Sequence, residues 1–343
     1  MKSKNKKKLQ GIIFARAFCC IGIVIYHYFC VSNEKFNPFY KTANSDFGFL
    51  YVTSFFCISG AVLYYNYPKI LSIKSFYYKR WKSILVPYHI CFTYFFLTTA
   101  FRAHKIFYKG DWSRIFITII GLDGYFKYKI KTYYLVGEWF LGAIIIIYIL
   151  YPIILFLVNK CNIIVNNIII CSLYLLMYKT KFFIIGKRRN IITCIASFYF
   201  GMEIIRFEKF YLMKKMPLFI CIFVLVFLTF IKIETNIFIL IYQIQGFSLF
   251  IVLYQVGQYI MKTRLNAIFI EISNLSYGIY LYHHRIIYDI LSMNNPKANE
   301  RYLLFLLLAF STSLTIICAK IHTIVVNLIY RSYIFKKLDS IFI

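Results

Sequence analysis

The amino-acid sequence predicts an all-α protein that crosses a lipid bilayer several times. Of its 343 residues, 61% are hydrophobic and only 15% are charged, whereas a soluble domain is roughly 45–50% apolar and about 25% charged. The mean hydropathy is +0.69. One globule cannot bury so much apolar surface, and so few polar groups cannot cover it. The composition therefore excludes a disordered chain and argues against a soluble enzyme.

Ten apolar runs have the length of about 20 residues that a helix needs to span the hydrocarbon core. We expect helices near residues 11–31, 47–66, 84–101, 136–158, 162–178, 191–205, 217–233, 237–260, 267–291 and 302–330. The run at 191–205 is short, which indicates a tilted or broken helix. The apolar piece 115–122 is too short to span and is expected to be re-entrant or interfacial. No hydrophilic stretch is long enough for a soluble domain, so residues 1–343 are expected to form one membrane domain.

The first run follows a basic tip, residues 1–10, and a secretory signal is the alternative to a retained helix. The run is about 20 residues long, contains Arg16 and lacks a small-x-small cleavage site. We therefore expect a helix that stays in the protein.

The net charge is +28, from 40 Lys and Arg against 12 Asp and Glu. Such a charge would suggest nucleic acid in a soluble protein. Here the basic residues cluster at the edges of apolar runs, so lipid headgroups are the expected partner and nucleic acid is not. The positive-inside rule predicts that both termini lie inside. Segments 102–131 and 179–189 do not fit this rule, because they are basic and would lie outside.

Two ionisable residues in the first predicted helix need a reason, because charge inside a membrane is costly. Arg16 and His27 are 11 residues apart, about 20° past three full turns, so their side chains share a face. They are separated by about 16 Å along the axis. This arrangement offers a fixed cation at one depth and a titratable imidazole at another. The alternative is that Arg16 snorkels and His27 caps a neighbouring helix.

A basic segment precedes the third predicted helix and holds Arg80 and Lys82. Cations beside a helix N-terminus make a phosphate site, and Arg80 and Lys82 are the candidates to bind a phosphate group there. The alternative is that these cations only keep the segment on the inner side of the membrane. Ser59 and Gly60, near the end of the second helix, form a small pair that favours close helix packing. Ser59 is also a candidate pocket residue.

The fourth predicted helix opens with Glu138 and Trp139, at a depth similar to that of His27. Glu138 could orient or charge-stabilise the imidazole, or it could be a solvated carboxylate. Trp139 suits an interfacial anchor.

In the ninth predicted helix, Tyr280 and His283 are i, i+3 neighbours and share a face. Tyr280 or Trp139 could donate to an oxyanion, and His283 is a further pocket candidate. No metal is expected, because His283 and its neighbour His284 point apart and no ligand cluster accompanies them.

Several motifs coincide in order along the chain. They are Arg16-x10-His27, Phe56-x2-Ser59-Gly60, Lys79-Arg80-x-Lys82 before Pro87-Tyr88, Trp139-Phe140-Leu141 followed by Tyr148 and Pro152, Gly201-Met202, and Leu275-Ser276-x-Gly278-Ile279-Tyr280-Leu281-x-His283. From about residue 9 to 330, this ordered set resembles the acyltransferase-3 family. Members of that family are ten-helix membrane O-acyltransferases that modify surface polysaccharides, peptidoglycan and related acceptors.

The resemblance implies that His27 is essential for acyl transfer and that Arg16 handles the donor. It implies acetyl-CoA or another acyl-CoA as a donor substrate, with no bound cofactor, and a hydroxyl of a cell-surface glycan or lipid-linked glycan precursor as acceptor. It also implies a multi-pass protein of a bacterial plasma membrane that works with polysaccharide-assembly proteins. The family's Arg-x-x-Arg pattern is not clearly matched, because residues 79–83 read Lys-Arg-Trp-Lys-Ser.

Two other classes of function remain as alternatives. A transporter or flippase for a glycan or lipid would also need a polar seam through a helix bundle, but paired broken helices in equivalent halves are not seen. A non-catalytic partner of a surface-polymer assembly complex would not need Arg16 and His27.

Overall fold

A computed structural model describes residues 2–32, 46–107, 111–180, 185–207, 215–230, 238–294 and 300–343. Every regular element within these ranges is helical. The long elements are α1 (Lys2–Val31), α2 (Phe47–Asn66), α3 (Ile73–Arg102), α6 (Glu138–Lys160), α7 (Ile163–Lys179), α8 (Ile191–Arg206), α10 (Lys215–Phe230), α11 (Phe238–Ile260), α12 (Asn266–Asn294) and α13 (Arg301–Tyr330). The short elements are η1 (Trp112–Arg114), α4 (Ile115–Ile119), α5 (Asp123–Phe126), η2 (Lys187–Arg189) and α14 (Tyr333–Phe342).

The predicted all-α class is confirmed for the described residues, and each expected run contains a helix. Within the described ranges, six helices are long and apolar enough to cross a membrane: α1 from Gln10, α2, α3, α6, α11 and α13. Helices α7 and α10 are apolar but shorter. The count of ten crossings and the inside position of both termini therefore remain predictions. The short piece at 115–122 is α4 and the turn after it.

Two helical segments extend beyond the predicted runs. Helix α3 begins at Ile73, 11 residues before the expected start at 84, and Ser72 caps it by accepting a hydrogen bond from the Ser75 N–H. Helix α14 lies after the last predicted run, 302–330. Apolar run length detects the membrane-buried part of a helix, so it misses the parts that are rich in Lys and Arg.

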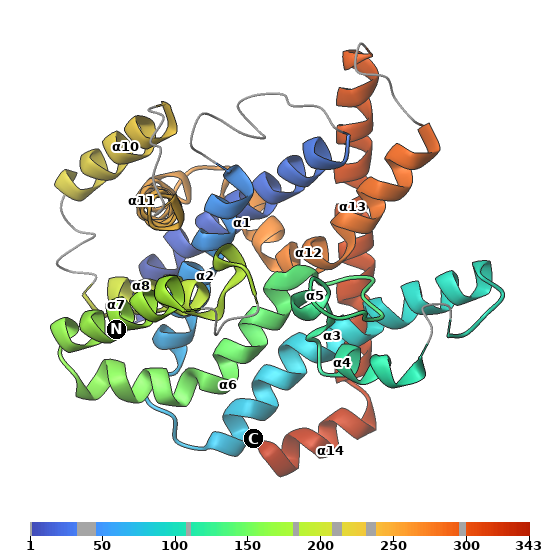
Figure 1. Ribbon diagram of the computed structural model, residues 1–343, viewed down its shortest axis with the longest axis horizontal. Helices are drawn as coiled ribbons and strands as arrows, with labels where there is room; N and C mark the ends of the chain where they lie inside the picture. Colours follow the sequence, from blue (N-terminus) through green and yellow to red (C-terminus); the bar gives the residue numbers. More distant parts are fainter. Residues whose placement is uncertain are drawn as a thin grey trace.

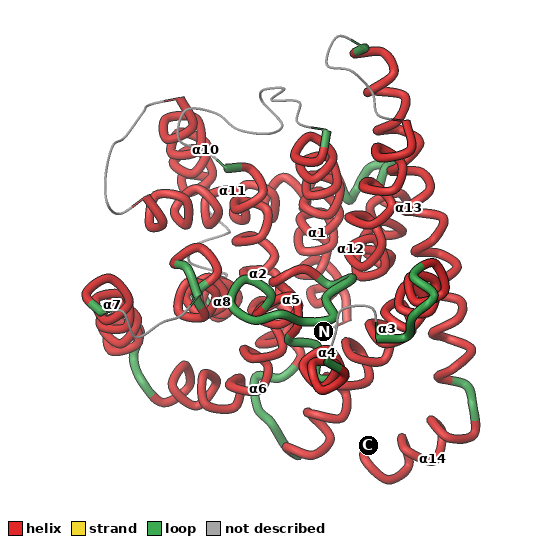
Figure 2. The backbone as a smooth tube through the Cα atoms, turned by 45° about the vertical axis from the view of Figure 1, so that its right-hand side comes forward, coloured by secondary structure: helices red, strands yellow, loops and turns green. Residues whose placement is uncertain are grey.

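Helix α1 lies at the centre of the bundle and packs against α2, α11 and α12. Figures 1 and 2 both show α7 and α10 at one edge of the molecule and α13 at the opposite edge. Helices α2 and α8 cross in close contact. A Cβ added to Gly60 would overlap the Phe198 carbonyl, and one added to Gly201 would overlap the Cys57 carbonyl. The glycines therefore let the two backbones touch, as the small pair predicts.

Candidate active site

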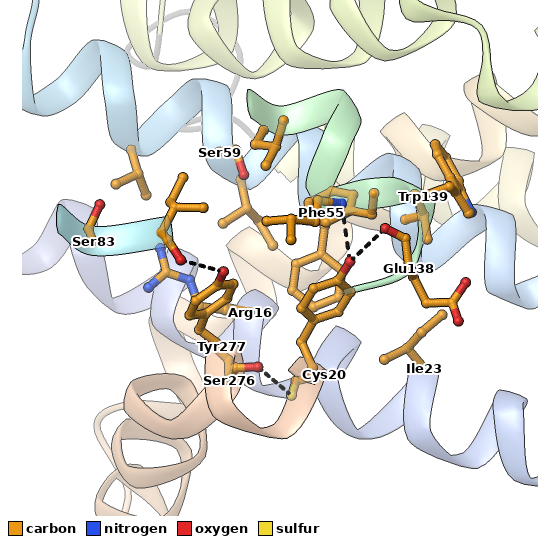
Figure 3. Close-up of a pocket in the computed structure, with 18 of the residues that line it drawn as sticks. Arg16, Cys20, Ile23, Phe55, Ser59, Ser83, Glu138, Trp139, Ser276 and Tyr277 are labelled. Atoms are coloured by element: carbon orange, nitrogen blue, oxygen red, sulfur yellow. Dashed lines mark hydrogen bonds between the residues drawn. The ribbon is translucent and has the colours of Figure 1, made fainter. Parts of the chain in front are cut away.

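A cavity of about 320 Å³ lies among α1, α2, α3, α6 and α12 (Figure 3). Arg16 and Ser83 lie at one end, here called the Arg16 end, and Glu138 and Trp139 lie at the other, here called the Glu138 end. Most of the site residues singled out in the sequence line this single cavity: Arg16, His27, Ser59, Arg80, Glu138, Trp139, Tyr280 and His283. They come from five helices that are far apart along the chain.

Two cations line the Arg16 end. Among the described residues, the Arg16 guanidinium has no carboxylate or hydrogen-bond partner. Arg80 donates to the Tyr67 hydroxyl at 3.3 Å, and its guanidinium lies 5.1 Å from the centre of the Tyr67 ring. The buried Nε of Arg80 has no partner within the described part of the chain. Positive charge in this end is therefore not neutralised by the surrounding side chains that the structure describes.

Tyr148 contributes a further aromatic side chain to the cavity. The Arg80 guanidinium lies 5.9 Å from the centre of its ring. Helix α6 positions it ten residues after Glu138, nearly three turns along the same helix. Tyr148 therefore places an aromatic ring beside Arg80.

Two imidazoles, those of His27 and His283, line the cavity, and a third, that of His284, lies against His27. The centre of the His27 ring lies 5.2 Å from that of His283 and 5.0 Å from that of His284. His283 is only 1% exposed. Its Nδ1 lies 2.9 Å from the Tyr280 carbonyl and 3.1 Å from the Ile279 carbonyl. Since carbonyls only accept, Nδ1 carries the proton, and Nε2 is a buried acceptor without a partner among the described residues.

Glu138 contacts three side chains. Its carboxylate accepts a hydrogen bond of 2.5 Å from the Tyr134 hydroxyl and lies 3.6 Å from both Lys127 Nζ and His284 Nε2. The side chain is 12% exposed, which disagrees with the solvated alternative. Burial raises the pKa of Tyr134 well above its ordinary value, and the neighbouring carboxylate adds to this, so Tyr134 stays a donor. Glu138 thus brings a negative charge close to the three imidazoles.

The start of α6 is held by α12. Gly137 has a φ of +85°, a left-handed conformation that favours glycine, and the helix begins at the next residue. The Tyr280 hydroxyl donates to the Gly137 carbonyl at 2.7 Å and accepts from the Leu141 N–H at 3.1 Å. This hydroxyl is already engaged with the backbone, so Tyr280 positions Glu138 rather than pointing a spare donor into the cavity.

Lys82 is placed differently from the prediction. It does not line the cavity, and its ammonium lies 2.7 Å from the Asp339 carboxylate of α14. Tyr78 also donates to Asp339 at 2.7 Å. These two hydrogen bonds, the lysine first, lower the pKa of Asp339. Residues two apart on a helix do not face the same way, which explains why Arg80 reaches the cavity and Lys82 does not.

Sequence reasoning missed several residues of the site. Tyr134, Lys127 and His284 surround Glu138, and Cys20, Ser276 and Tyr277 complete the wall of the cavity. The one available signal was the position of Cys20 one turn after Arg16, on the same face of α1. The others come from segments whose approach to Glu138 depends on tertiary packing.

The fold and the cavity define a multi-pass helical membrane protein with buried cations and imidazoles in one site. The model of the acyltransferase-3 family, described as an acyltransferase domain, matches residues 9–322. The chain therefore belongs to this family and is a membrane acyltransferase. No curated protein and no solved structure gives a significant match to the chain.

Proposed function

We propose that this membrane acyltransferase moves an acetyl group from acetyl-CoA to a hydroxyl of a cell-surface glycan or of a lipid-linked glycan precursor. The observation that carries the proposal is the shared cavity, with Arg16 and Arg80 at one end and His27 with His283 in the other half. The donor needs cations for its phosphates and a base near its thioester, and the cavity offers both.

The size of the cavity supports the proposal that only one part of the donor enters it. Its volume of about 320 Å³ is at the low end of roughly 300–1,000 Å³ for ligand pockets. The narrow pantetheine arm and its thioester would enter, and the nucleotide would stay outside the Arg16 end. Arg16 and Arg80 would bind the phosphates. In the proposed orientation, this end faces the cytosol of a bacterial cell.

His27 is proposed as the general base. Its neutral imidazole takes the proton of the acceptor hydroxyl, and the oxygen attacks the thioester carbonyl carbon. The tetrahedral intermediate then collapses: the carbon–sulfur bond breaks, the ester remains on the acceptor, and the imidazolium returns the proton to the departing thiolate. Glu138 stabilises the imidazolium while it exists.

The test is acyl transfer in membrane vesicles that are supplied with labelled acetyl-CoA and acceptor glycan. We expect label on the glycan with the unaltered protein and none with His27→Ala at the same protein level. His104→Ala is the matched control, because His104 is exposed and lies outside the cavity. Equal labelling with His27→Ala would overturn the role of His27. Glycan movement across the vesicle without release of coenzyme A would favour the transporter, and label trapped on His27 would indicate a covalent acyl-imidazole.

A further inference from the structure

Two basic segments that violate the predicted topology converge in the structure. They are the chain around Lys127, within 102–131, and η2, within 179–189. The Arg189 guanidinium lies 3.7 Å from the centre of the Tyr128 ring. Lys127 Nζ lies 5.2 Å from the centre of the same ring and 3.6 Å from that of the Tyr134 ring. A tyrosine with one cation from each segment therefore forms a small basic site, here called the Tyr128 site.

One cation of the Tyr128 site, Arg189, is left for a further anion. Lys127 Nζ lies 3.6 Å from Glu138, and Arg188 is neutralised by Asp46 at 2.8 Å. Arg189 has no carboxylate within ion-pair distance among the described residues. Burial lowers the pKa of Lys127 and the nearby Arg189 adds to this, whereas Glu138 and Asp123 oppose it. Arg189 is therefore the cation that can pair with a further negative charge.

The Tyr128 site adjoins the cavity at its Glu138 end. Lys127 Nζ is 3.6 Å from Glu138, which lines the cavity and lies near His27. The site is therefore at the opposite end from Arg16 and Arg80, where the donor phosphates are proposed to bind. A substrate that enters at the Glu138 end would meet Arg189 and Tyr128 before it reaches His27.

We infer that the acceptor is anionic: a carboxylate or phosphate close to the acylated hydroxyl binds Arg189 and Lys127, and the sugar ring lies against Tyr128. This inference rests on the proposed function, since it assumes that the acceptor enters at this end. Arginine suits the recognition because its planar fork pairs with carboxylate or phosphate through two hydrogen bonds. The same chemistry occurs in an acidic sugar and in the phosphate of a lipid-linked precursor.

The experiment measures binding and turnover separately with the full chain in nanodiscs of uncharged phosphatidylcholine. The probes are an oligosaccharide of hexuronic acid, its carboxyl methyl ester, and a short-chain prenyl phosphate sugar. We expect the acidic oligosaccharide or the prenyl phosphate sugar to bind without acetyl-CoA and the methyl ester to bind at least about tenfold more weakly. Which of the two anionic probes binds identifies the source of the charge.

Variants then assign the binding to the Tyr128 site. Arg189→Gln should raise the Kd for the anionic probe about tenfold, and Arg189→Lys should restore part of the affinity. Lys187→Gln is the matched control, since Lys187 lies in the same short helix and stacks on Tyr178 at 3.9 Å instead. The KM for acetyl-CoA should not change in any of the three.

Three results would overturn the inference. They are equal binding of the acid and its methyl ester together with no binding of the prenyl phosphate sugar, an equal effect of Arg189→Gln and Lys187→Gln, and an effect of Arg189→Gln that appears only when anionic lipid is added. The last result would assign the cations to lipid headgroups. Binding that depends on Arg189 without any acyl transfer would leave the anion site intact and count against the proposed function alone.

Discussion

His283 faces His27 with a centre-to-centre distance of 5.2 Å, and its proton is fixed on the nitrogen that points away from the cavity. Two carbonyls of α12 hold Nδ1, so Nε2 can only accept. A modest rotation would let an N–H of His27 donate to Nε2, because hydrogen-bonded imidazoles have about this separation. The other nitrogen of His27 would then keep its lone pair for the acceptor hydroxyl. His283 is thus expected to act as a positioning residue for His27.

Substitution of His283 tests this arrangement. His283→Asn keeps a donor near the position of Nδ1 but removes Nε2, so we expect a folded protein whose turnover falls about 100-fold. His283→Gln places an amide near Nε2 and should recover part of the loss, and neither change should alter the KM for acetyl-CoA. His322→Asn is the control, because His322 is also a buried histidine with an unpartnered Nε2 among the described residues but lies outside the cavity. Unchanged turnover in His283→Asn would contradict the role.

Tyr280→Phe tests whether Tyr280 only stabilises the structure or also donates a hydrogen bond to an oxyanion. The change removes the hydrogen bonds to the Gly137 carbonyl and from the Leu141 N–H. We expect a loss of stability of about 1 kcal/mol, measured as a lower thermal midpoint, with turnover reduced only a few-fold. If turnover instead falls by about 100-fold or more at unchanged stability, Tyr280 is a donor to the intermediate.

Arg80 and Lys82 are expected to differ in their effect on the donor. Arg80→Ala should raise the KM for acetyl-CoA at least about tenfold, because a charged contact to phosphate is lost. Lys82→Ala should raise this KM less than Arg80→Ala does. Its effect should equal that of Asp339→Asn, since both changes break the ion pair between α3 and α14. If Lys82→Ala raises this KM and Asp339→Asn does not, Lys82 binds the donor directly.

The crossing of α2 and α8 should be sensitive to a single methyl group. Gly60→Ala and Gly201→Ala each place a Cβ against a backbone carbonyl of the other helix, and we expect each to cost about 1–3 kcal/mol of stability. Gly186→Ala is the control, because no atom lies within 4 Å of its added Cβ. Heating in detergent, followed by size-exclusion chromatography, compares the variants. Equal midpoints for all three would mean that the helices separate at little cost.

Helix positions could be predicted from this sequence because lipid removes most alternatives. An apolar run such as 47–66 must hydrogen-bond its own backbone, and α2 has these same bounds. Arg16 and His27 could be paired for a similar reason, since one helix fixes their relative direction. Glu138 was expected near His27 because the two predicted helices bring them to a similar depth, whereas His283 was a pocket candidate from the face that it shares with Tyr280 and from the family's motif.

Other parts of the site depend on packing between distant segments. Lys127 and Tyr134 lie eleven and four residues before Glu138, in a segment without a helical pattern, and His284 comes from the distant α12, so the sequence did not indicate that all three contact Glu138. The separation of Arg80 from Lys82 depends on where α3 begins, and apolar run length placed that start after both residues. The pairing of Lys82 with Asp339 could not be anticipated, because the tail was not expected to be helical.

Helix α14 lies beyond the residues that the family model matches, 9–322, yet it contacts the segment of α3 that carries Arg80. Trp81 stacks on Phe335 and Tyr78 stacks on Phe342, on either side of the Lys82–Asp339 pair. A short C-terminal helix therefore packs against the part of α3 that carries Arg80. Substitutions in α14 are therefore expected to shift the backbone beside Arg80, although this helix lies outside the residues that the family model matches.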